Sequence, residues 1–63
     1  MIIIEKNSLS VKYYEQILQL DDSKIVIKMV DNVIKIRGEK LNVSYYTSVE
    51  VVVHGTFSSI HFQ

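Results

Sequence analysis

The sequence predicts an all-β protein of five or six short antiparallel strands, arranged as a curved sheet or a partly open barrel. Apolar and polar residues alternate with a period of two along most of residues 24–62, which is the pattern of a strand with one buried face. The chain has no proline and only two glycines, so Asp, Asn and Ser residues must mark most of the turns. All 63 residues are expected to form a single small β domain.

The front of the chain, residues 9–20, is compatible with two structures. Several of its apolar residues lie near helical spacing, which favours an amphipathic helix that covers one face of the sheet. The same residues also fit one or two strands interrupted at Tyr13-Tyr14, with a turn at Asp21-Asp22-Ser23. We favour strands, because β-branched residues are frequent throughout the rest of the chain.

Residues 24–38 are predicted to form a β-hairpin. The run KIVIKMV places Ile25, Ile27 and Met29 on one face, and VIKIRG continues the same alternation. Asp31-Asn32 separates the two runs, and both residue types tolerate the positive φ of a two-residue hairpin turn. Four cationic side chains are expected together on the outer face of this hairpin, where like charges keep a sheet soluble: Lys24, Lys28, Lys35 and Arg37.

A further strand is predicted directly after Gly38. In the run LNVSYY, the alternation puts Leu41, Val43 and Tyr45 on one face and Tyr46 on the other. A break is expected at residues 47–48.

The carboxyl end of the chain is predicted to contain the last strands. In VEVVVHG the alternation turns Val49, Val51 and Val53 inward. Beyond this run, Phe57 and Ile60 are three positions apart, which breaks a strict period of two. A β-bulge near residues 58–59 would restore the alternation.

The two glycines end two similar apolar runs, IKIRG at residues 34–38 and VVVHG at residues 51–55. This repeat predicts two strand-bend-strand corners. Gly38 and Gly55 would supply either a positive φ or room for a close backbone approach. A glycine that makes room for a ligand is the alternative, but neither run belongs to a phosphate-binding glycine motif.

The residues around the glycines form a longer frame. It reads Ile34-x-Ile36-x-Gly38-Glu39-x-Leu41-x-Val43, then Val51-x-Val53-x-Gly55-x-Phe57-x-x-Ile60-x-Phe62. This frame resembles the carboxyl half of the YabP/YqfC family of sporulation proteins from endospore-forming bacteria, over about residues 24–62. The resemblance implies a small all-β structural or scaffolding protein linked to assembly of the spore envelope, the cortex especially. It carries over no catalytic residue.

The length of the chain predicts self-association. A domain of 63 residues buries only about 60% of the surface that its unfolded chain exposes. The chain has no cysteine for a disulfide, and His54 and His61 alone are too few for a structural zinc site. Association with further copies buries more apolar surface, so we expect a homo-oligomer.

Charge and hydropathy exclude several partners. Seven basic residues balance seven acidic ones, so no net charge attracts nucleic acid or anionic lipid. The start MIIIEKN lacks the basic and long apolar regions of a signal peptide, and no apolar run approaches the roughly 20 residues of a transmembrane helix. We expect a cytoplasmic location, no integral membrane segment and no nucleic-acid partner.

No group of residues predicts catalysis, a cofactor or a metal site. Glu39 and Glu50 lack an accompanying nucleophile or oxyanion donor, and no acid completes a triad with the serines near His61. Two histidines without a third ligand make a poor metal site, and surface histidines are the simpler interpretation. We therefore expect no enzyme activity.

The tyrosine pairs provide a candidate protein-contact surface. Tyr14 and Tyr46 are expected to point outward, and exposed tyrosines are common in interfaces because a rigid ring buries much area. The alternative is that they only cover the open face of the sheet. The full candidate surface is Tyr14, Tyr46, Val52, Lys35 and Arg37. A rival function, a small phage or mobile-element protein that binds and inhibits a host protein, would act through Tyr46, Val52 and the outer face of the hairpin.

Overall fold

The computed structural model describes all 63 residues and contains six β-strands and no helix. The strands are β1 (Ile2–Ile4), β2 (Ser8–Lys12), β3 (Gln16–Leu20), β4 (Lys24–Lys28), β5 (Val33–Tyr46) and β6 (Glu50–Phe62). They form one antiparallel sheet in the order β1-β2-β6-β5-β4-β3. The all-β prediction is confirmed, as is the preference for strands over a helix in residues 9–20. No helix that could cross a membrane is present.

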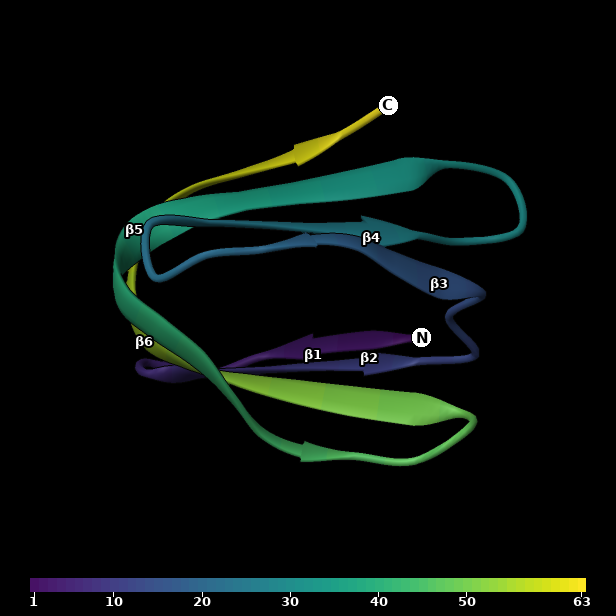
Figure 1. Ribbon diagram of the computed structural model, residues 1–63, viewed down its shortest axis with the longest axis horizontal. Helices are drawn as coiled ribbons and strands as arrows, with labels where there is room; N and C mark the ends of the chain where they lie inside the picture. The colour runs from purple at the N-terminus through teal and green to yellow at the C-terminus, as the bar shows by residue number, and fades with distance from the viewer.

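β5 and β6 are long strands that bend together. The sequence pattern predicted short strands on either side of each glycine, but β5 runs unbroken for 14 residues and β6 for 13. Gly38 pairs with Phe57, and Glu39 pairs with Thr56, so the two bends lie side by side. The two predicted corners are therefore one shared corner, where both strands curve over together (Figure 1).

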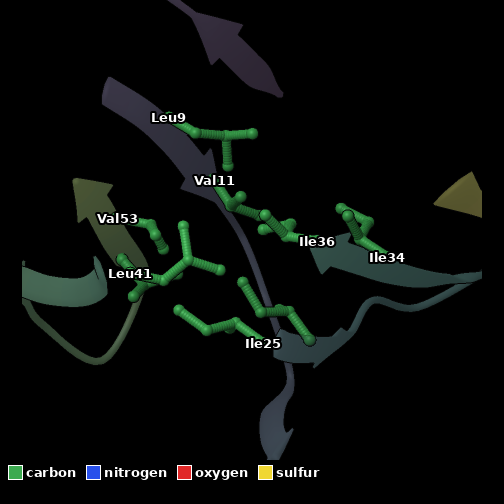
Figure 2. Close-up of a cluster of buried hydrophobic side chains, with 9 residues drawn as sticks. Leu9, Val11, Ile25, Ile34, Ile36, Leu41 and Val53 are labelled. Carbon is green, nitrogen blue, oxygen red and sulfur yellow. The ribbon is translucent and has the colours of Figure 1, made fainter. Parts of the chain in front are cut away.

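The shared bend folds the single sheet into two facing layers (Figure 1). The first layer contains β3, β4 and the adjoining ends of β5 and β6, residues 33–37 and 56–62. The second layer contains β1, β2 and the other ends of the long strands, residues 42–46 and 50–54. Strand residues from both layers meet in one apolar cluster (Figure 2): Leu9, Val11, Ile25, Ile27, Ile34, Ile36, Leu41, Val51 and Val53.

Both glycines are required by the geometry of the bend. A Cβ on Gly38 would lie 1.9 Å from the carbonyl oxygen of Thr56 on the neighbouring strand. Gly55 has a φ of +143°, and a Cβ there would lie 2.9 Å from the carbonyl oxygen of Lys40. The space beside each glycine is thus filled by the protein's own backbone, as the structural interpretation predicted.

The same pairing register occurs in both layers. In the first layer Ile34 pairs with Ile27, and in the second layer Val51, which also lies four residues before a glycine, pairs with Val11. The backbone hydrogen bonds of the two glycines are equivalent as well. Gly38 donates to the carbonyl of Ser23 at 3.1 Å, and Gly55 donates to that of Asn7 at 3.2 Å. The repeated runs IKIRG and VVVHG therefore occupy equivalent places in two similar halves.

The β4–β5 hairpin is confirmed, but its turn lies one residue earlier than predicted. Met29 donates its N–H to the carbonyl of Asn32 at 2.8 Å, which centres the turn on Val30 and Asp31. Neither residue has a positive φ. This register pairs isoleucine with isoleucine twice across the hairpin, whereas a turn at residues 31–32 would place Ile25 opposite Gly38.

The β5–β6 turn also begins where predicted but extends further. The Thr47 hydroxyl accepts hydrogen bonds from the N–H groups of Val49 and Glu50 at 3.2 and 3.1 Å. Val49 therefore belongs to the turn and is exposed, so the prediction that it faces inward is wrong. The predicted bulge is confirmed, because Arg37 pairs with Ser59 and Gly38 with Phe57, which leaves Ser58 as the extra residue.

The bend predicts the effect of Gly38→Ala. We expect the free energy of unfolding to fall by at least about 2 kcal/mol, because the new methyl group meets backbone that cannot give way locally. Urea unfolding followed by circular dichroism at one fixed protein concentration measures the change. Ser48→Ala, at an exposed turn position, is the control and should stay within about 0.5 kcal/mol. Equal midpoints for the two variants would contradict this account of the bend.

Candidate functional site

The surface of the protein has one hollow, an open groove of about 510 Å³. It lies between β3, at the edge of the first layer, and the carboxyl end of β5, at the edge of the second. All four residues that line it are hydrophobic: Ile17, Leu20, Val43 and Tyr46.

Two β-bulges aim these side chains into the groove. In β3, Ile17 pairs with Ile27 and Leu20 pairs with Ile25, and the bulge at Leu18 lies between them. Directly paired residues point to the same face of a sheet, and both isoleucines of β4 are fully buried. Ile17 and Leu20 therefore face inward although they are three positions apart.

β5 repeats this arrangement on the other side of the groove. Val43 pairs with Val53, and Tyr46 pairs with Val51, with the extra residue of the bulge at Ser44. Both partners are buried core residues, so Val43 and Tyr46 face inward and Tyr45 faces outward. The bulge reverses the predicted orientation of both tyrosines. β-bulges often redirect a side chain beside a functional site, which makes this groove the candidate site.

The groove combines exposure with an absence of charge. Leu20 is 55% exposed and Tyr46 is 68% exposed, although both point toward the space between the layers. Residues 16–20 and 41–49 include no charged side chain, whereas 22% of the whole chain is charged. The groove therefore suits contact with apolar, uncharged groups.

The predicted contact residues do not form one surface. Tyr46 lines the groove. Val52 pairs with Ser10 and Tyr45 on the outer face of the second layer. Lys35 and Arg37 lie on the outer face of the first layer, where they pair with Val26 and Lys24 in β4.

Tyr14 differs most from its expected position. It is half-buried and packs against the apolar core, and its hydroxyl donates a hydrogen bond to the carbonyl of Thr47 at 2.7 Å. The prediction that this ring points outward is wrong. Tyr14 connects the β2–β3 segment to the β5–β6 turn, and this is a structural contact.

The cationic residues of the β4–β5 hairpin occupy the outer face of the first layer, as predicted. Lys24 pairs directly with Arg37, and Lys28 makes an exposed ion pair with Glu15 at 3.1 Å. Such an exposed pair contributes little to stability.

The titratable residues weighed as catalytic or metal-binding groups are dispersed. His54 pairs with Ser8 in the second layer, and His61 pairs with Lys35 in the first. The Glu50 carboxylate accepts a hydrogen bond from the hydroxyl of Ser10 at 2.7 Å. Glu39 is exposed at the bend. These residues converge on no common point.

The fold and the groove together define a small all-β protein with a two-layered sheet and one apolar groove. The chain belongs to the YabP family, whose model matches residues 1–63. The match thus includes the front of the chain as well as the region around the glycines. Membership of this family indicates a sporulation-associated protein, and the family is not a known enzyme family. No curated protein matches the chain.

The position of Tyr14 predicts that its hydroxyl stabilises the fold. Tyr14→Phe removes a partly buried hydrogen bond and should lower the free energy of unfolding by about 1 kcal/mol. Thermal or urea unfolding measures the loss. Tyr13→Phe is the matched control, because the neighbouring ring is 68% exposed and its hydroxyl makes no intramolecular hydrogen bond. Equal stability of the two variants would show that the contact with Thr47 contributes nothing.

Proposed function

We propose that this protein is a non-enzymatic structural or scaffolding component in assembly of the spore envelope, the cortex especially, and that it acts as a homo-oligomer. Membership of the YabP family supports the link to spore formation. The proposed cytoplasmic location is that of a protein made inside the cell and recruited to the forming envelope.

The distribution of apolar side chains is the observation that supports a scaffolding role. Only 10 of 63 residues are buried, and the core consists entirely of apolar side chains. Several large apolar side chains remain exposed, and Leu18, Leu20 and Tyr46 belong to the two strands that border the groove. A chain of this size gains stability when such surface is covered by another protein molecule. Self-association is the simplest way to cover it.

Removal of the gene from an endospore-forming host that carries it tests the proposed role. We expect spores with a thin or incomplete cortex in electron micrographs of thin sections. Restoring the intact gene, or a Ser48→Ala copy as a neutral variant, should restore the cortex.

A cortex of normal thickness in the deletion strain would contradict the proposed role. If the protein then copurified with a host protein from non-sporulating cells, the rival function of an inhibitor would be favoured.

A further inference from the structure

We propose that the groove is the contact through which two copies of this chain associate, each placing its Tyr46 and Leu20 side chains against the groove of the other. This inference rests on the proposed self-association and specifies the surface that performs it. The occupant of the groove is therefore a second copy, related to the first by a two-fold axis.

The strand edges favour contact through side chains over addition of strands. Bulges interrupt β3 at Leu18 and the free end of β5 at Ser44, and beyond its bulge at Ser58 the free end of β6 has only four regularly paired residues, Ser59 to Phe62. The remaining edge strand, β1, has only three residues. Bulged or very short edges are poor templates for pairing with another strand. The same bulges in β3 and β5 direct Leu20 and Tyr46 into the groove, so they disfavour one mode of association while they build the surface for the other.

The absence of charged side chains beside the groove favours a second copy as the occupant. The strand and turn segments beside the groove, residues 16–20 and 41–49, are uncharged, so a partner surface that carried charges would lose solvation there without an ionic partner. In a two-fold dimer the same patch faces itself. Because a second copy has the same sequence, its groove is equally apolar and uncharged.

The surface area of the chain is also compatible with a second copy as the occupant. An ordinary stable interface covers about 800 Å² on each partner, which is about a fifth of the 4115 Å² of surface of this chain. One copy therefore has room for such a contact on one whole side. The side with the groove offers both a hollow and projecting apolar side chains, which a self-complementary contact requires.

The difference between the two similar halves limits the assembly to a closed pair. The position in β6 that corresponds to Val43, five residues after its glycine, is Ile60, and the position that corresponds to Tyr46 is Gln63. No groove forms there. With one groove per chain, the two-fold contact uses the hollow of each copy and leaves no equivalent site for a third.

Light scattering after size exclusion, over a range of concentrations, tests the contact. The intact protein should show twice the 7.3 kDa mass of one chain. Tyr46→Ser should raise the dissociation constant of the dimer by at least about ten-fold, as loss of a central aromatic side chain does in other interfaces. The matched control is Tyr45→Ser, which removes the neighbouring ring from the outward face and should change the constant by less than about three-fold. Circular dichroism confirms that each variant keeps its β-sheet.

Cross-linking provides a second readout, which traps the contact covalently. Because the chain has no cysteine, Tyr46→Cys introduces a single thiol at the groove, and at a protein concentration above the dissociation constant of this weakened variant a thiol-specific cross-linker should yield a covalent dimer. Val30→Cys, at a position that is 70% exposed in the β4–β5 turn, should give no covalent dimer under the same treatment.

The outcomes separate this inference from the proposed function. A Tyr46→Ser variant that remains as dimeric as the intact protein would overturn the groove as the contact and leave self-association standing. An intact protein that is monomeric at all concentrations would overturn both, while the role in the spore envelope is decided by the gene deletion alone.

Discussion

The close approach of β5 and β6 at their shared bend is the constraint on which the rest of the structure depends. Gly38 passes so near to the carbonyl of Thr56 that no side chain fits, and this contact lets two paired strands change direction together without separating. Each bend is also tied to a hairpin, since the glycine N–H groups bond the carbonyls of Ser23 and Asn7. The bend thus fixes where β1–β2 and β3–β4 lie, and it brings their isoleucine, leucine and valine side chains into one core.

The repeated register explains how so small a chain obtains two matching layers. Each half uses a hairpin and one arm of a long strand, and each contributes buried pairs such as Ile25 with Ile36 and Leu9 with Val53. The halves differ at their outer edges. β3 and the end of β5 have bulges that turn apolar side chains inward, whereas β1 is short and regular. The shared pattern therefore accounts for the core, and the departures from it account for the groove.

The sequence predicts the strands better than it predicts where their side chains point at the edges. Alternation located the β4–β5 hairpin, and the spacing of Phe57 and Ile60 located the bulge at Ser58, because a strict period of two visibly fails there. The bulge at Ser44 leaves no such trace. Tyr45 and Tyr46 are identical neighbours, so either ring satisfies the alternation. The inward position of Tyr14 escaped prediction for a similar reason, since its hydrogen bond to Thr47 depends on a segment 33 residues away.

The order of the strands has a consequence for how the chain folds. Four of the five strand pairings join strands that follow one another along the chain, and only β2 with β6 joins distant segments. Hairpins between chain neighbours form quickly, whereas a distant pairing must first close a long loop. We therefore expect the β1–β2 hairpin to dock last and to open first.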